Sequence, residues 1–314
     1  MRTALPLTVL ATALACSLGT APAHARARTF VASYGNDANP CTFGSPCKTF
    51  QQAINVVDVG GEVTAIDSAG FGPISINKSV TITSPPGVEA GIVPTAGGTA
   101  IDISTAPSTD TIVLRGLTLQ GGGGIGQDGI NISTGGNIEI VDCAIRGFAE
   151  SGIVIINQSA QMSVAILNTL VADTPFGIQI EASSSSMQVA IDGVKLNNNS
   201  NAGINLFAFG GLLEVSIANS RIDNAANVGL FMDGESATGA AFLRNVTITQ
   251  APIGITLSGS SVVYLSQVQQ QAFLGFTNTA GIKLNGAGTV AISDGTNHIQ
   301  SGIVGGSLTS WGFQ

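Results

Sequence analysis

The chain contains 314 residues, of which 44% are hydrophobic and only 10% are charged, whereas about 25% charged residues is typical of globular proteins. A chain this apolar must collapse, which excludes intrinsic disorder. The 19 acidic and 11 basic residues give a net charge of −8, so no basic surface is expected for a phosphate backbone. We therefore predict no nucleic-acid partner.

The first 25 residues have the features of a secretory signal peptide. Arg2 gives a positive start, residues 4–18 are almost wholly apolar, and residues 23–25 read Ala-His-Ala, a small-x-small cleavage signal. We predict cleavage after Ala25 and a secreted protein, periplasmic or extracellular. A lipoprotein anchored at Cys16 is the alternative. No later apolar run is long enough for a transmembrane segment.

Residues 26–60 predict a strand, a cysteine loop and a capping helix. Cys41 and Cys47 flank a turn-forming segment, and export permits a disulfide between them, which we predict; two unpaired thiols are the alternative. Ser45 can cap a helix with Pro46 at its first position. Apolar residues follow at the helical spacing i, i+3, i+4 and i+7, namely Phe50, Ala53, Ile54 and Val57. Such a helix would cover the open end of the structure that follows.

Residues 61–314 contain a repeat. A Gly-apolar-x-apolar unit recurs at intervals of 23 to 27 residues, and it begins at Gly129, Gly152, Gly177, Gly203, Gly229, Gly254 and Gly281. Each period also holds two further short segments of alternating polarity, rich in Ile and Val. Three short strands per coil predict an all-β fold, a single-stranded parallel β-helix with coils stacked roughly 4.8 Å apart. Leucine-rich repeats are the alternative, although no coil contains a helical stretch.

A polar column recurs where the second strand of a coil must bend into the third. It contains Asp142, Asn168, Asn219, Asn245, Gln267 and Asp294. Asn and Asp tolerate the left-handed backbone conformation that such a bend needs, and stacked side-chain amides can hydrogen-bond along the column. We interpret the column as structural, with a metal or catalytic role as the alternative.

Four segments of the N-terminal part point to a family. Residues 29–41 contain Thr-Phe-Val-Ala-Ser and Gly-Asn-Asp-Ala-Asn-Pro-Cys, residues 46–54 contain Pro-Cys-Lys-Thr-Phe and Ala-Ile, residues 60–63 are Gly-Gly-Glu-Val, and residues 75–82 are Ser-Ile-Asn-Lys-Ser-Val-Thr-Ile. Together they resemble secreted bacterial right-handed β-helix repeat proteins of the pectate-lyase-like superfamily. The resemblance implies a right-handed coil but no one activity, because the superfamily includes lyases, hydrolases, epimerases and tailspikes.

Catalytic signatures of that superfamily are missing from the sequence. There is no Asn-Thr-Asp segment, adjacent Asp pair, Gly-His-Gly or Arg-Ile-Lys, the motifs of polygalacturonase-like hydrolases. Cleavage after Ala25 would leave His298 as the only histidine, which disfavours histidine metal sites and Ser-His-Asp triads. We predict no metal and no cofactor; Ca²⁺ held by acids from different coils is the alternative, without a supporting motif.

Outward positions of the Gly-apolar strands supply the candidate site residues, because that sheet forms the substrate groove in related enzymes. Glu181 and Asp233 lie two coils apart in one column, about 9–10 Å by strand spacing, near the roughly 6.5–9.5 Å between the carboxyl groups of inverting glycosidases. They are the candidate catalytic pair. The candidate substrate-binding residues are Asn131, Gln179, Asn205, Phe207, Phe231 and Lys283. Catalysis, sugar binding without catalysis and an ordinary solvated face all stay open.

We hypothesise that the protein is a non-catalytic glycan-binding or surface scaffold protein whose partner is a polysaccharide or a cell-surface glycan. The alternative is a polysaccharide lyase or glycoside hydrolase that acts in the groove over the Gly-apolar sheet.

Overall fold

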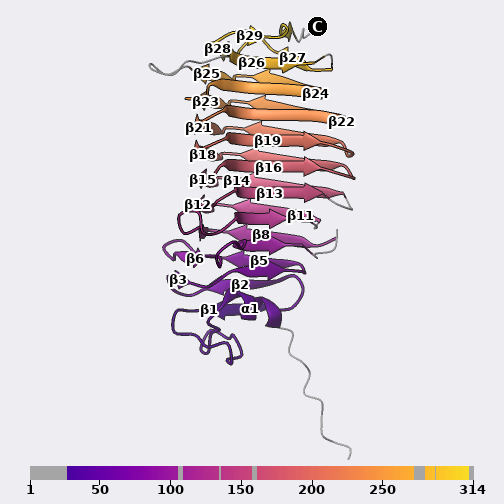
Figure 1. Cartoon of the computed structure of the whole chain (residues 1–314). Helices are drawn as coiled ribbons and strands as arrows, with labels where there is room; N and C mark the ends of the chain where they lie inside the picture. Colours follow the sequence, from indigo (N-terminus) through magenta and orange to yellow (C-terminus); the bar gives the residue numbers. More distant parts are fainter. Residues whose placement is uncertain are drawn as a thin grey trace, which may run out of the picture.

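The fold is a parallel β-helix, seen in a computed structural model that describes residues 27–104, 109–133, 136–157, 161–271, 280–286 and 288–310. In this part of the chain the coils stack along one axis above a single short helix at the N-terminal end (Figure 1). The predicted signal peptide lies outside the described residues. No helix within these ranges is long and apolar enough to cross a bilayer.

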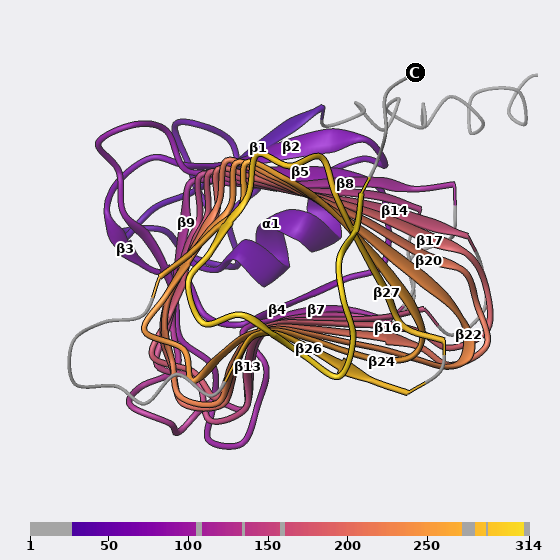
Figure 2. The same cartoon turned by 90° about the horizontal axis from the view of Figure 1, so that it is seen from above.

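Each coil has three sides, which we call the front, back and side sheets (Figure 2). All their strand pairings are parallel, as in the β10–β13 and β11–β14 pairs. The front sheet consists of β4 (Ile74–Ile76), β7 (Ile101–Ile103), β10 (Asp128–Ile132), β13 (Ser151–Asn157), β16 (Phe176–Ala182), β19 (Ala202–Ala208), the first parts of β22 (Val228–Arg244) and β24 (Ile253–Ser266), β26 (Ala280–Asn285) and β29 (Ile303–Val304).

The back and side sheets complete the coil. The back sheet consists of β1 (Arg28–Val31), β2 (Gly61–Ala65), β5 (Val80–Thr83), β8 (Thr111–Arg115), β11 (Asn137–Val141), β14 (Met162–Leu167), β17 (Met187–Asp192), β20 (Leu213–Ala218), the second parts of β22 and β24, β27 (Val290–Ser293) and β30 (Thr309–Ser310). The side sheet consists of β3 (Ala69–Gly70), β6 (Ala90–Ile92), β9 (Leu117–Gln120), β12 (Ala144–Arg146), β15 (Leu170–Ala172), β18 (Lys195–Asn199), β21 (Arg221–Ala225), β23 (Thr247–Thr249), β25 (Gln269–Gln271) and β28 (His298–Ile299).

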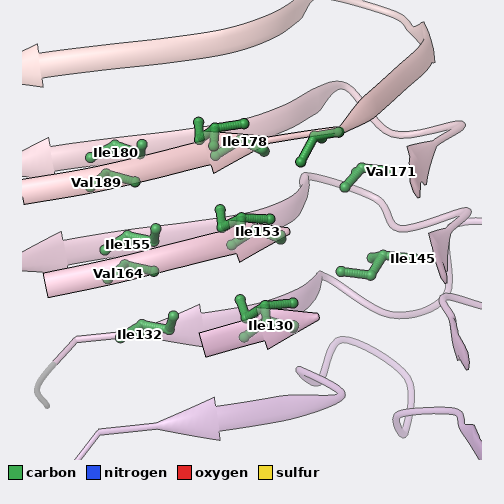
Figure 3. Close-up of a cluster of buried hydrophobic side chains, with 14 of the residues drawn as sticks. Ile130, Ile132, Ile145, Ile153, Ile155, Val164, Val171, Ile178, Ile180 and Val189 are labelled. Carbon is green, nitrogen blue, oxygen red and sulfur yellow. The ribbon is translucent and has the colours of Figure 1, made fainter. Parts of the chain in front are cut away.

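The core is a continuous column of stacked aliphatic side chains (Figure 3). In the Gly-apolar unit both apolar residues point inward, so Ile130, Ile153 and Ile178 are register partners on successive coils and are fully buried. Stacking identical side chains leaves few voids and removes apolar area from water on every coil. The repeat seen in the sequence is therefore the packing unit of the core.

The glycine of each unit is required by the next coil. A Cβ on Gly177 would lie 2.5 Å from the carbonyl oxygen of Gly203, and a Cβ on Gly203 would lie 2.7 Å from that of Gly229. Neither glycine has a left-handed backbone, so the requirement is close approach of two backbones and not conformational freedom.

The polar column at the bend between the back and side sheets is structural, as predicted. Asp142, Asn168, Asn219, Asn245 and Gln267 have φ between 48° and 54°. Asn245 Nδ2 donates to Asn219 Oδ1, and Asn219 Nδ2 donates to Asp192 Oδ1, both at 2.9 Å. The prediction was wrong for Asp294, because Gly295, with φ 85°, takes the left-handed position on that coil.

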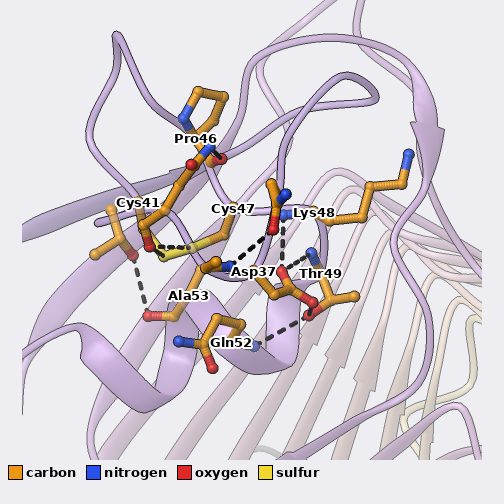
Figure 4. The surroundings of a disulfide bond; sticks show 12 residues. Asp37, Cys41, Pro46, Cys47, Lys48, Thr49, Gln52 and Ala53 are labelled. Carbon is orange, nitrogen blue, oxygen red and sulfur yellow. Dashed lines mark hydrogen bonds between the residues drawn. A yellow bond between two sulfur atoms is a disulfide. The ribbon is translucent and has the colours of Figure 1, made fainter.

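Helix α1 (Phe50–Val56) covers the first coil with Phe50, Ala53 and Ile54 buried. It begins four residues later than the predicted start at Pro46, and its N-cap is Thr49, not Ser45, because the Thr49 hydroxyl accepts the N–H of Gln52. Residues 45 and 46 instead belong to the loop closed by the predicted Cys41–Cys47 disulfide (Figure 4).

The disulfide loop is tied to the helix by one carboxylate. Asp37 Oδ1 accepts the backbone N–H groups of Lys48 and Thr49 at 2.8 and 2.9 Å (Figure 4). A carboxylate that accepts several backbone N–H groups orders the segment that supplies them. The cystine and Asp37 therefore fix the start of the capping helix.

Candidate functional site

The outer face of the front sheet carries the predicted columns in the predicted register. Glu181, Phe207 and Asp233 are successive register partners on β16, β19 and β22. The neighbouring column runs through Asn131, Val154, Gln179, Asn205, Phe231, Thr256 and Lys283. All of the predicted front-face residues thus lie on one sheet, in two adjacent outward columns.

Aromatic rings form a cluster at the centre of this face. The ring of Phe207 stacks on Phe209 with centroids 5.4 Å apart and an interplanar angle of 10°, and it meets Phe231 at 5.7 Å in a tilted arrangement. Glu181 and Asp233 flank Phe207 on the two adjacent coils. We call Phe207, Phe209 and Phe231 the aromatic cluster. Sugar rings present apolar C–H faces that pack on such surfaces, while carboxylates beside them can accept hydrogen bonds from sugar hydroxyl groups.

Side-chain amides on the front face are oriented by carboxylates. Gln179 Nε2 donates to Glu181 Oε1 at 2.8 Å, and Asn131 Nδ2 donates to Asp102 Oδ1 at 2.9 Å. Each amide thus has a defined direction. Lys283, by contrast, lies three coils beyond Asn205, and so roughly 14 Å from it by strand spacing. Lys283 is thus distant from Asn131, Gln179 and Asn205, and lies two coils beyond Phe231, roughly 10 Å by strand spacing.

A hollow of about 670 Å³ lies over β10, β13 and β16, beside the aromatic cluster. Its lining includes Asp128, Asn131, Glu150, Val154, Phe176 and Gln179, and we call it the front hollow. Small-molecule sites commonly have volumes of roughly 300–1,000 Å³. The front hollow is thus of a size to hold a small polar ligand or part of a longer one.

Asp128 is the most perturbed acid in the front hollow. Burial raises the pKa of Asp128 to about 6, and the negative charge of Glu150 adds to the increase, while the N–H of Ser151 donating to Oδ1 at 3.0 Å opposes it. A carboxyl group with this pKa changes its charge close to neutral pH. Perturbed acids in a hollow are frequent in functional sites.

Asp128, Glu150 and Phe209 were missed by the sequence analysis. Asp128 directly precedes a repeat glycine, in register with Ser151 and Phe176, so its place on the front face was readable from the repeat. Glu150 could not be placed in this way, because it lies in a connection between the side and front sheets. Phe209 follows Phe207 by two residues, the spacing that keeps side chains on one face of a strand.

No group of three or more His, Cys, Asp and Glu side chains is placed to hold a metal ion in the part of the chain that the structure describes. That the protein needs no metal and no cofactor stays a prediction, with Ca²⁺ as its alternative.

Comparison with known proteins supports the architecture. A family model described as a right handed beta helix region matches residues 76–222. No curated protein matches the chain significantly in sequence.

Several solved structures share this fold. An alginate lyase from Paenibacillus sp. str. FPU-7 has a TM-score of 0.60 and 13% identity, and the match covers 90% of this chain and 99% of that one. Pectate lyase Pel9A has a TM-score of 0.51 and 13% identity over 88% of this chain and 79% of the lyase. Tailspike protein 2 of the Escherichia coli O157:H7 bacteriophage CAB120 has a TM-score of 0.54 and 11% identity, over 84% of this chain but 42% of the tailspike. At these identities the likeness shows the fold alone.

Proposed function

Because the chain is a right-handed parallel β-helix protein with the pectate-lyase-like fold, we propose that it binds a polysaccharide along the outer face of its front sheet without cleaving it. The observation that carries this proposal is the aromatic cluster, in which Phe207 lies between Glu181 and Asp233 on in-register strands. Three rings and two acids on one face offer the combination of apolar and hydrogen-bonding surface that a sugar needs.

The regular spacing of the coils favours an extended ligand. Outward groups recur roughly every 4.8 Å along the axis. Asn131 and Gln179 present amides in one column over β10 to β16, and the column continues through Asn205 on β19, which is only 7% exposed. A polymer with repeated hydroxyl groups can contact several coils at once. Once one contact has formed, the next is intramolecular, so several weak contacts together give a higher affinity than each alone. The proposed setting is outside the cytoplasm, after export directed by residues 1–25.

Affinity electrophoresis of the full chain in gels that contain single polysaccharides tests the proposal, followed by calorimetry with any ligand found. Phe207→Ala should weaken binding roughly tenfold, because it removes an aromatic stacking partner. The matched control is Phe242→Ala, on the back sheet, where Phe242 stacks on Tyr264 at 4.6 Å. If the two variants lose the same amount of affinity, or if Phe207→Ala loses none, the front face is not the polysaccharide-binding surface.

A second candidate function is cleavage of the bound chain, favoured by the position of Glu181 and Asp233 two coils apart in one column. Mass spectrometry of the incubated polysaccharides tests it, with and without Ca²⁺. Unsaturated products identify a lyase and saturated products a hydrolase. If a cleavage is found and Glu181→Gln and Asp233→Asn leave its rate unchanged, the catalytic pair is wrong.

A further inference from the structure

The front hollow has an apolar floor and a polar rim. Val154, on the central strand β13, is only 9% exposed, and it lies in register between Asn131 and Gln179. Phe176 adds an aromatic ring beside this floor. The two amides and the carboxylates of Asp128 and Glu150 surround it. Such a site suits a ligand with a C–H face and polar groups at its edge.

Three amides that line the front hollow each donate one N–H to a carboxylate. Gln127 donates to Glu150 at 3.1 Å, Asn131 to Asp102 at 2.9 Å and Gln179 to Glu181 at 2.8 Å. These bonds orient the amides, and each amide keeps its carbonyl oxygen and a second N–H, for which the described part of the chain provides no partner. Groups that both accept and donate pair best with hydroxyl groups, which do the same.

The charge around the front hollow has one sign. Two carboxylates line it, those of Asp128 and Glu150, and no Lys or Arg is among its described lining residues. Two more carboxylates, those of Asp102 and Glu181, accept N–H groups from the lining amides of Asn131 and Gln179. In the two outward columns defined above, the described residues include one cation, Lys283 on β26. It lies four coils beyond Gln179, roughly 19 Å by strand spacing, whereas screening at physiological salt acts over about 8 Å.

We propose that the front hollow is a subsite for an uncharged sugar residue and that it excludes uronates. The inference rests on the proposed function, since it names the class of sugar that the front face takes. A hydroxyl-bearing ring can pack on Val154 and Phe176 while its hydroxyls pair with the amides and carboxylates. A uronate would bring a further negative charge close to the two lining carboxylates and the two bonded to the lining amides, and the described lining residues include no Lys or Arg to pair it.

The test uses pairs of ligands that differ only in charge. Polygalacturonate and alginate are each compared with their carboxyl-reduced forms, and xylan and glucomannan extend the neutral set, in calorimetry with the full chain at pH 7.5. We expect the neutral form of a pair to bind on the order of tenfold more tightly than the acidic form, because the acidic form meets like charges at close range.

Two double variants assign this preference to the front hollow. Asp128→Asn with Glu150→Gln removes two charges from its rim and should reduce the preference severalfold. Glu139→Gln with Glu214→Gln removes two exposed charges from the back sheet, so it changes the net charge equally and should leave the preference unaltered. A third variant, Val154→Arg, places a cation over the floor and should favour the acidic form.

The outcomes separate this inference from the proposed function. If the acidic forms bind the wild-type protein as tightly as the neutral forms, and Phe207→Ala weakens the binding of both, the inference is overturned and the proposed function stands. The inference is also overturned if both double variants keep the full preference for neutral over acidic forms. Failure of every polysaccharide to bind overturns the inference and the proposed function together.

Discussion

Asp128→Asn should make the protein more stable at neutral pH. The carboxyl group of Asp128 has its pKa raised from 3.8 to about 6, chiefly by burial, so the folded state holds this proton more tightly than the unfolded state. Between about pH 4 and pH 6 the folded protein therefore binds more protons, and its stability falls as the pH rises through this window. The loss is nearly complete by about pH 7 and constant above it.

The size of the effect follows from the shift. Two pKa units correspond to about 3 kcal/mol, and because the side chain is only partly buried, solvent screening reduces this to about 1–2 kcal/mol. Asparagine keeps an oxygen to accept the N–H of Ser151 but does not ionise. The variant should thus gain about 1–2 kcal/mol at pH 7.5 and almost nothing near pH 4.

Thermal unfolding followed by circular dichroism from pH 4 to pH 8 measures this difference. A gain of 1–2 kcal/mol corresponds to a rise in Tm of about 2–4 °C for a chain of this size, and the two curves should converge as the pH falls below 6. A difference that is independent of pH, or a variant less stable than wild type at pH 7.5, would refute the assignment of a raised pKa to Asp128. A gain would also mean that the chain retains this acid at a cost in stability, as functional sites commonly do.

Two further perturbations test the elements that order the coil. Replacing Cys41 and Cys47 together by serine should lower the free energy of unfolding by about 2 kcal/mol, the chain-entropy value for so short a loop. Thermal unfolding with and without reductant measures this loss. If reductant still lowers the Tm of the double variant, the disulfide is not the cause. Asn219→Ala should cost about 1–2 kcal/mol, because φ is 48° there and two amide hydrogen bonds are lost. Asn219→Gly should cost less, since glycine accepts that φ, and equal urea midpoints for the two variants would exclude backbone conformation as the cause.

The repeat made the coil and its outward columns predictable, whereas the connections were not. A strand alternates its side chains, so the glycine positions were enough to place Glu181, Phe207 and Asp233 in one column. The front hollow depends on the connections that carry Glu150 and Pro175, which differ between coils and follow no period. The perturbed pKa of Asp128 depends on that local burial, so the sequence contained no sign of it.

The helix start was predicted wrongly for a related reason. A Ser-Pro pair is a valid local signal for a helix N-terminus, but the loop closed by Cys41 and Cys47 holds it outside the helix, and the carboxylate of Asp37 fixes the backbone at Lys48 and Thr49 instead. Tertiary constraints set the boundary here, whereas the apolar spacing of Phe50, Ala53 and Ile54 correctly identified the buried face.

The stacked glycines also determine how such a molecule can change in length. At each repeat glycine the space that a Cβ would occupy is taken by a carbonyl oxygen of the following coil, as with Gly177 and Gly203. Each coil therefore restricts the residue type at the glycine of the coil before it. A duplicated coil would bring its own glycine and create no new clash, while a point substitution at an existing glycine would displace its neighbour. Insertion of one coil between β16 and β19 would move the front hollow away from the aromatic cluster by one strand spacing, roughly 4.8 Å. The separation of two subsites on this face can therefore evolve only in discrete steps, by whole coils gained or lost.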